Sequence, residues 1–121
     1  RHMDRSKTDA LFQAIEKLAA QIPSVQFEIE KTIDKGSVCC DGTLMHTIET
    51  AAKMCGTTYT VMPSGAGHDA NPMAHRLPIG MIFVPSRGGL SHCKEEWTDP
   101  EDLRRGVEVL YHTVLSLDAE S

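Results

Sequence analysis

An uninterrupted apolar run, Ile-Gly-Met-Ile-Phe-Val at residues 79–84, constrains the fold of this chain more than any other feature. The run does not alternate apolar with polar residues, and it ends at Pro85. This pattern is typical of a strand buried on both faces of a mainly parallel sheet. It therefore predicts an α/β fold, in which ligands bind beyond the carboxyl ends of the strands.

The residues before this run predict a helix and a strand. Apolar residues recur at helical spacing over residues 9–21, which predicts an amphipathic helix with one buried face, and Ser6 and Asp9 have the spacing of a capping box. Residues 25–30 alternate apolar with polar side chains, as in an antiparallel sheet with one wet face. The turn-rich residues 34–37 then predict a domain boundary.

Two more helices and one more strand are predicted after that boundary. A helical stripe over residues 44–55 stops at Gly56, which suits the left-handed conformation after a helix. Residues 57–62 are typical of a short strand. The last helix is expected to start near Pro100, with acidic residues in its first turn, and to cover the sheet through its apolar stripe as far as Leu117.

Composition restricts the class of partner. The chain has 121 residues, 40% hydrophobic content and a formal net charge of -5, which is typical of a folded domain rather than a disordered one. The acidic balance and the lack of a basic cluster disfavour nucleic acid, because phosphate binding needs concentrated Lys and Arg. No apolar run approaches the roughly 20 residues of a membrane-spanning helix. A small polar ligand is therefore expected.

The four cysteines follow neither a structural zinc pattern nor the regular spacing of a disulfide framework. Cys39 and Cys40 are adjacent, so their side chains should point to opposite faces of an extended segment. We interpret all four as reduced thiols in a cytoplasmic protein. The chain opens on Arg1-His2-Met3, which is compatible with a piece of a longer polypeptide or with the remnant of an expression tag.

Two histidines in glycine-containing loops are the candidate functional residues. His68 follows Ser-Gly-Ala-Gly, and His92 follows Gly-Gly-Leu-Ser, each after a predicted strand. Glycine permits backbone to approach a substrate closely, and an imidazole is a common metal ligand. The plainer interpretation of His92 is an exposed or hydrogen-bonded loop residue, and that of His68 is a residue at a helix start.

These motifs, in this order, resemble the carboxyl-terminal part of a known enzyme family. The resemblance rests on residues 1–2, 62–70, 81–86 and 89–92, followed by Glu96 and residues 101–102. The family comprises dinuclear-metal amidohydrolases of the zinc-peptidase-like superfamily. It includes allantoate amidohydrolase, ureidoglycolate amidohydrolase, β-ureidopropionase of the yeast type and the N-carbamoyl-L-amino-acid hydrolases.

The resemblance implies a two-part architecture. Residues 1–35 would be the last helix and strand of an inserted, ferredoxin-like lid or dimerisation domain. Residues 36–121 would be the carboxyl-terminal part of an α/β metallohydrolase catalytic domain. A homodimer formed through the lid sheet is implied as well, and an exposed strand edge at residues 25–30 would invite such pairing.

The resemblance also implies a pair of divalent ions, zinc or manganese, in the complete enzyme. Only His92 matches one of the family's metal ligands, and no catalytic residue of the family falls within this chain. A single imidazole does not hold two ions, because metal sites depend on several ligands fixed together. The chain alone is therefore expected to be inactive and to need the upstream half of the catalytic domain.

Substrate contacts are implied at two further places. His68 corresponds to a substrate-binding histidine, and Gly65, Ala66 and Gly67 would present backbone amides to the substrate. Arg1 corresponds to an arginine that grips the substrate carboxylate, a task that suits its planar, two-pronged donor. Glu96 could support a site group, although an exposed loop carboxylate is an equal alternative.

The leading hypothesis is hydrolysis of a linear amide or ureido C–N bond in a small carboxylate-bearing substrate, such as an N-carbamoyl amino acid or allantoate. Aminoacylase or dipeptidase chemistry on the same scaffold is the second hypothesis. A non-catalytic fragment or association module is the third. The three differ in which bond, if any, the complete protein breaks.

Overall fold

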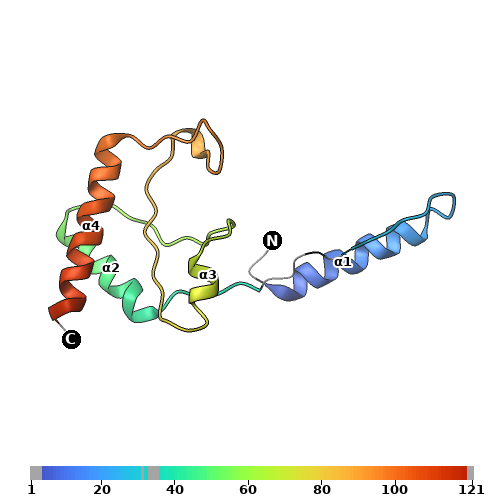
Figure 1. The fold of residues 1–121 in the computed structure, drawn as a ribbon, viewed down its shortest axis with the longest axis horizontal. Coiled ribbons are helices and arrows are strands. Elements are labelled where there is room, and N and C mark those ends of the chain that lie inside the picture. The colour runs from blue at the N-terminus through green and yellow to red at the C-terminus, as the bar shows by residue number, and fades with distance from the viewer. Residues whose placement is uncertain (1–3, 31, 33–35, 120–121) are drawn as a thin grey trace.

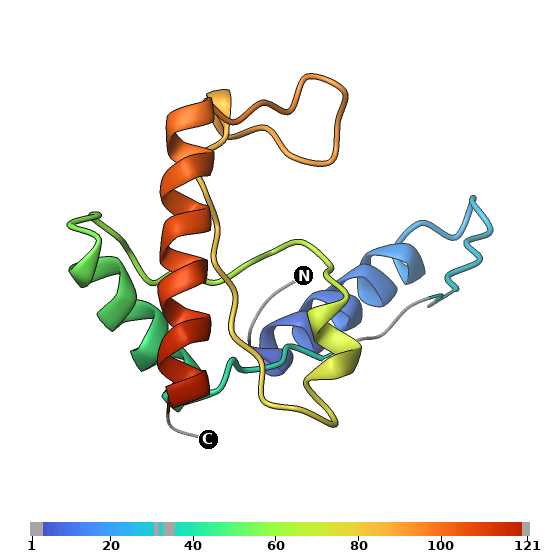
Figure 2. The ribbon, with the colours of Figure 1, turned by 60° about the vertical axis from the view of Figure 1, so that its left-hand side comes forward.

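Four helices and one short 3-10 turn make up the regular structure of the described residues (Figure 1). The computed structural model describes residues 4–30, 32 and 36–119. In chain order the elements are α1 (Arg5–Ala20), α2 (Gly42–Met54), α3 (Ala70–Met73), η1 (Arg87–Gly89) and α4 (Pro100–Ala119). The helices α2 and α4 pack side by side, whereas α1 extends away from them (Figures 1 and 2). No helix in the described part combines the length and the apolar content needed to span a membrane.

The predicted strands are not formed. Residues 25–30, 57–62 and 79–84 have no strand assignment, and neither does any other described residue. The α/β prediction is therefore wrong for the described chain, which is helical with long connecting segments. A pattern of apolar residues indicates which side chains tend to be buried. A strand forms only where a neighbouring strand supplies hydrogen-bond partners for its backbone. No described segment supplies them.

The helix α1 begins earlier than its apolar stripe suggested. The Asp4 carboxylate is the N-cap, and it accepts hydrogen bonds from the backbone nitrogen and the hydroxyl of Ser6 at 2.9 and 2.6 Å. The predicted capping box of Ser6 and Asp9 is therefore wrong, because both residues lie inside the helix. The predicted buried face is wrong as well: no residue of α1 is buried, and Leu11 and Leu18 are 60% and 61% exposed.

The helix α2 ends as the local sequence predicts, and its start is capped by a side chain that the sequence motifs did not single out. Asp41 caps its start by accepting from the backbone nitrogens of Thr43 and Leu44 at 2.9 and 3.0 Å. At its end, Gly56 has a φ of 62° and Thr57 donates its backbone N–H to the carbonyl of Ala52 at 3.0 Å. This is the glycine-terminated stop expected for residues 44–55.

The core lies where α2 crosses α4. Ala51 and Ala52 of α2 face Val109 of α4, and all three side chains are buried. Thr113 is also buried, and its hydroxyl donates to the carbonyl of Val109 at 2.7 Å, so that no buried polar atom lacks a partner there. Small residues allow the two helices to approach closely, so this contact fixes the register of α2 on α4.

Residues 79–84 run across both helices and are the third component of the core. An added Cβ at Gly80 would lie 2.8 Å from the Ile48 side chain, and one at Gly106 would overlap the Val84 side chain. Backbone therefore approaches side chain closely at two points along the segment. The opposite side is uncovered, as the 49% exposure of Phe83 shows, so the predicted burial on both faces is only half present.

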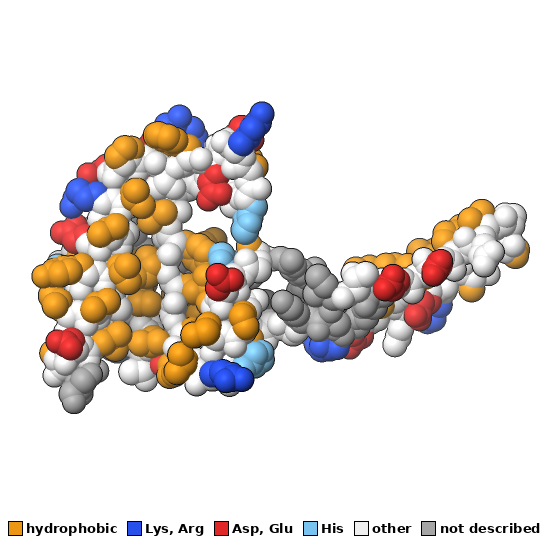
Figure 3. All heavy atoms as spheres, in the orientation of Figure 1, with side chains coloured by type: hydrophobic (Ala, Val, Ile, Leu, Met, Phe, Trp, Pro, Cys, Tyr) orange, Lys and Arg blue, Asp and Glu red, His pale blue; other side chains and the backbone are white. Residues whose placement is uncertain are grey.

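The last helix, α4, was predicted to cover a sheet, but the described residues form no sheet for it to cover. Its apolar stripe faces outward, and hydrophobic side chains gather over this part of the surface (Figure 3). About half of each side chain or more is exposed at Leu103, Val107, Leu110, Tyr111, Val114 and Leu115. Contiguous apolar surface of this kind is rare on isolated proteins and marks a surface that another structure covers.

The close contact between Gly106 and Val84 can be tested by substitution. We expect Gly106→Ala to lower the free energy of unfolding by about 1 kcal/mol, because overpacking by a methyl group costs about 1–3 kcal/mol and exceeds the helix-propensity gain of about 1 kcal/mol. Urea denaturation of the intact protein measures this difference.

Gly42→Ala is the matched control, because an added Cβ at this α2 position meets nothing within 4 Å. It should be neutral or stabilising. The loss caused by Gly106→Ala should shrink in a Val84→Ala background. Equal losses with and without Val84→Ala would refute the packing contact as the cause.

Candidate functional site

The loop before α3 holds His68 through a neighbouring hydroxyl. The Ser64 Oγ lies 3.1 Å from the His68 Nε2, and the Ala66 backbone nitrogen donates to the same Oγ at 3.3 Å. The His68 carbonyl accepts from the Asn71 backbone nitrogen at 3.0 Å as the chain enters α3. The imidazole is therefore tied to its own turn. Asp69 precedes α3 but makes no side-chain capping bond.

His92 has an unusual backbone conformation. Its φ is 58°, and among the described non-glycine residues it alone has a positive φ. Such a conformation is uncommon for a residue with a Cβ and persists where neighbouring groups stabilise it. Glu96 supplies that stabilisation, because its Oε2 accepts the His92 backbone N–H at 2.8 Å. The carboxylate of Glu96 therefore does support a site group, by holding the backbone rather than the ring.

The base of the His92 loop is closed by a three-residue clasp formed by Arg87, Trp97 and Asp99. The Asp99 Oδ1 accepts from the Arg87 guanidinium at 2.8 Å and from the Trp97 indole nitrogen at 3.1 Å. The guanidinium also lies 5.8 Å from the indole centroid, and the Arg87 backbone nitrogen donates to the Trp97 carbonyl at 2.8 Å. The Trp97 and Arg87 donors favour the charged carboxylate and lower the pKa of Asp99.

The two histidine loops meet. The ring centroids of His68 and His92 are 6.4 Å apart, and His68 lies 5.5 Å from the ring of Phe83. The two loops therefore lie next to each other, although the strands that were predicted to place them at one edge of a sheet are not formed. Two imidazoles at this separation can contact one small ligand from two sides.

The other predicted substrate contacts remain predictions. Gly65 and Gly67 are exposed in the His68 turn, and Ala66 between them is half-buried. An added Cβ at Gly65 would meet nothing within 4 Å, so the described chain itself does not require glycine there. Arg1 lies outside the described residues, as does residue 35 at the predicted domain boundary.

The described residues supply only part of a metal site beside His92. Three metal-ligating side chains converge at only one place among them, where Cys55, Glu108 and His112 meet, and His92 is not a member of that group. One imidazole does not retain an ion without further ligands. The role of His92 as a metal ligand therefore stays a prediction that requires donors from other residues.

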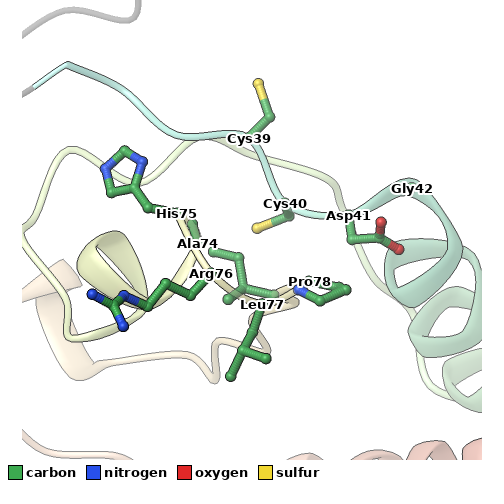
Figure 4. Close-up of a pocket in the computed structure, with 10 residues that line it drawn as sticks. Cys39, Cys40, Asp41, Gly42, Ala74, His75, Arg76, Leu77 and Pro78 are labelled. Atoms are coloured by element: carbon green, nitrogen blue, oxygen red, sulfur yellow. The ribbon is translucent and has the colours of Figure 1, made fainter.

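A hollow that neither of the two histidines lines is also present on the molecule. It has a volume of about 520 Å³ and is lined by the segments before α2 and after α3, including Cys40, His75 and Arg76 (Figure 4). Neither His68 nor His92 lines it, so it is separate from the two predicted site histidines. Figure 4 shows the Cys39 and Cys40 thiols pointing in different directions, and all four cysteines are free, as predicted.

Sequence reasoning missed several contacts of the site. Ser64 and Phe83 lie within motifs that were recognised, but their contacts with His68 depend on how the loops fold. His112 belongs to none of the motifs recognised in the sequence, yet it lies beside Cys55 and Glu108. The four-residue spacing of Glu108 and His112 on one helix face was the only local signal of that group.

Comparison with known proteins finds a matching family model and several similar enzymes. A family model described as peptidase family M20/M25/M40 matches residues 3–116. An N-carbamoyl-L-amino acid amidohydrolase of Geobacillus stearothermophilus is 39% identical over 112 residues, covering 90% of this chain and 27% of the relative. The allantoate amidohydrolase of Escherichia coli is 38% identical over 86 residues, covering 71% of this chain and 21% of the relative. A ureidoglycolate hydrolase of Oryza sativa is 44% identical over 70 residues, which are 58% of this chain and 14% of the relative. The chain thus spans about a quarter or less of these relatives.

Glu96 is expected to hold His92 in its positive-φ conformation. Replacing Glu96 with Ala removes the acceptor of the His92 N–H, so this amide should exchange with solvent about three- to tenfold faster. Hydrogen exchange read by NMR or mass spectrometry measures the effect in the intact protein. The neighbouring variant Glu95→Ala, whose carboxylate faces Lys94 at 3.5 Å, should leave the His92 amide unchanged. Equal effects of the two variants would contradict this role.

The clasp at Asp99 should open in acid. Because the folded state lowers the pKa of Asp99 below its ordinary 3.8, its contribution to stability is present at neutral pH and is lost as the pH falls through the lowered pKa. Trp97 fluorescence should therefore change below pH 3.8. The transition should disappear in Asp99→Asn and persist in Asp102→Asn, which changes an acid in the first turn of α4 outside the clasp. A midpoint above 3.8 would contradict the clasp.

Proposed function

The chain belongs to peptidase family M20/M25/M40, and on that premise we propose that it is the carboxyl-terminal part of a metal-dependent amidohydrolase. The proposed reaction is hydrolysis of a linear C–N bond in an N-carbamoyl amino acid or a related ureido acid such as allantoate. The observation that carries the proposal is the pairing of His68 with His92 at 6.4 Å, because each comes from a separate motif of the chain.

The two histidines have different proposed roles. His92 is proposed to be a ligand of a divalent ion, zinc or manganese, and its constrained backbone supports this role because a fixed donor binds a metal more tightly than a mobile one. His68 is proposed to contact the substrate, and its Ser64 partner orients the ring for that contact. The relatives named N-carbamoyl-L-amino acid and allantoate amidohydrolases support the substrate class.

The remaining parts of the catalytic centre are proposed to come from residues outside this chain. The family is generally metal-dependent. Divalent ions in such centres activate water and polarise a carbonyl. Because the described residues around His92 do not complete a metal site, we assign no catalytic residue to this chain and propose that it is inactive alone.

The architecture proposed for the complete protein keeps the two parts implied by the family. Residues 1–35 would belong to a lid or dimerisation domain, and the projection of α1 away from α2 and α4 supports that division (Figure 1). A homodimer would form through residues 25–30, where Val25, Phe27 and Ile29 are each about half exposed. Arg1 would grip the substrate carboxylate, and Gly65 to Gly67 would present backbone amides. A cytoplasmic location is proposed on the free cysteines alone.

Substrate turnover tests the function directly. The complete protein, which includes the residues proposed to lie outside this chain, should release ammonia from at least one member of a panel of N-carbamoyl amino acids and allantoate when it is supplied with zinc or manganese. N-acetyl amino acids and dipeptides in parallel assays separate this activity from aminoacylase or dipeptidase chemistry. Turnover of only the acyl or peptide substrates would replace the proposed reaction, and turnover of none would remove it.

Variants of the two histidines test their roles. His92→Ala should lower kcat by at least about a hundredfold and reduce the bound metal, because a ligand is lost. His68→Ala should lower kcat/KM by about ten- to a hundredfold while metal content is retained, since a substrate contact is lost. His75→Ala, which removes an exposed imidazole outside the site, should retain activity and metal. Full turnover and metal content in His92→Ala would overturn the assignment.

A further inference from the structure

A second group of metal-ligating side chains lies where the end of α2 meets the middle of α4. Ligand atoms of Cys55, Glu108 and His112 are all within 4.8 Å of one another, and each residue is partly buried. We propose that these three residues bind a single divalent cation of the zinc class. This site shares no residue with the proposed centre at His92.

Rigid elements position all three donors. Cys55 is the C-cap of α2, where its backbone N–H bonds to the Ala51 carbonyl at 3.0 Å and the glycine-terminated stop follows immediately. Glu108 and His112 are four residues apart on α4, so they project from one face on successive turns. The buried contact of α2 with α4 next to them sets their distance from Cys55. Donors fixed in this way lose little conformational freedom when they bind an ion.

The donor set selects the metal. A thiolate, an imidazole and a carboxylate are the three kinds of zinc ligand, and three protein donors leave a fourth position for water. Zn–S and Zn–N bonds of about 2.3 and 2.0 Å place the ligand atoms of a one-sulfur tetrahedral site about 3.3–3.5 Å apart. The three donors, within 4.8 Å, thus need to close by at most about 1.5 Å, which side-chain rotation can provide. A thiolate ligand disfavours magnesium and calcium, which take oxygen donors.

Space and charge are also compatible with an ion at this place. A cavity of about 330 Å³ gives access to Cys55 and Glu108, although not to His112, and residues 56–58 and 104–105 complete its lining. Arg104 also lines the cavity and bonds to Glu108 at 2.9 Å. Glu101 binds the same guanidinium through two hydrogen bonds of 2.9 and 2.8 Å. Arg104 therefore keeps a counter-charge when Glu108 turns toward the cation.

The charges of the occupied site balance. Binding displaces the thiol proton of Cys55, so a thiolate and the Glu108 carboxylate together neutralise a divalent cation, while His112 binds as the neutral imidazole. Metal binding should therefore release protons and weaken as the pH falls. It should also tie the end of α2 to α4.

Cobalt titration tests the proposal, because a Co²⁺ ion bound to a thiolate has a charge-transfer band in the near ultraviolet. The intact protein, stripped of metal, should gain this band as Co²⁺ is added, up to an intensity that corresponds to one thiolate-bound ion per chain, and Zn²⁺ should abolish it. Cys55→Ser should abolish the band, and His112→Gln should weaken cobalt binding by at least about a hundredfold. Glu108→Gln should weaken it by about tenfold or more.

Three control variants separate this site from others. Cys39→Ser and Cys93→Ser should keep the band, because these exposed thiols lie outside the group, and His92→Ala should keep it because that imidazole belongs to the other centre. The proposal is overturned by the absence of a band in the unmodified protein, by its survival in Cys55→Ser, or by its loss in His92→Ala or Cys93→Ser. These outcomes do not depend on any hydrolytic activity.

A measurement without substitution guards against misfolded variants. Zn²⁺ should slow alkylation of Cys55 in the unmodified protein by at least about tenfold, since a metal-bound thiolate is shielded from the reagent. Alkylation of Cys39, which is exposed and outside the group, should be unaffected by Zn²⁺. Equal rates at Cys55 with and without Zn²⁺ would overturn the proposal even if the variants do not fold.

Discussion

Close approach between α2, α4 and the segment 79–84 is the constraint on which the rest of the structure depends. Small residues make it possible: Ala51 and Ala52 face Val109, and the backbone at Gly80 and Gly106 lies against neighbouring side chains. Larger side chains at these places would separate the three components. The segment leads directly into the His92 loop, so its position on the helices determines where that loop begins.

The candidate site is formed by two loops that a rigid scaffold brings together. One loop holds His68 through Ser64, and the other holds His92 through Glu96 and closes at Asp99. Each loop uses short-range hydrogen bonds to set its own shape. Their meeting at 6.4 Å is a property of the scaffold, since the residues between them include the 79–84 segment. This division between local shape and global placement is common in enzymes, where loops carry the chemistry.

Uncovered apolar surface on α1, on α4 and beside Phe83 is consistent with a chain that spans about a quarter of its relatives. The apolar pattern of the sequence predicts that these faces are buried, yet no described residue covers them. The patterns at 25–30, 57–62 and 79–84 predict strands that pair with other strands, and this pairing is absent from the described residues as well. In both cases the described residues do not supply the covering or pairing element, so the predicted burial and strand pairing are absent from the described chain.

The sequence by itself determined the presence of α1, α2 and α4, the stop at Gly56, the acidic start of α4 and the family, because these depend on short-range spacing and on motifs in order. It did not determine the N-cap at Asp4, where the apolar stripe began too late to mark the helix start. Only the tertiary structure decided that His68 meets His92, that Glu96 holds a strained backbone, and that Cys55 lies beside Glu108 and His112. The physical reason is that the first and third contacts join residues far apart in the chain, so their geometry follows from how α2, α4 and the 79–84 segment pack, whereas the contact of Glu96 with His92 depends on the conformation of its loop.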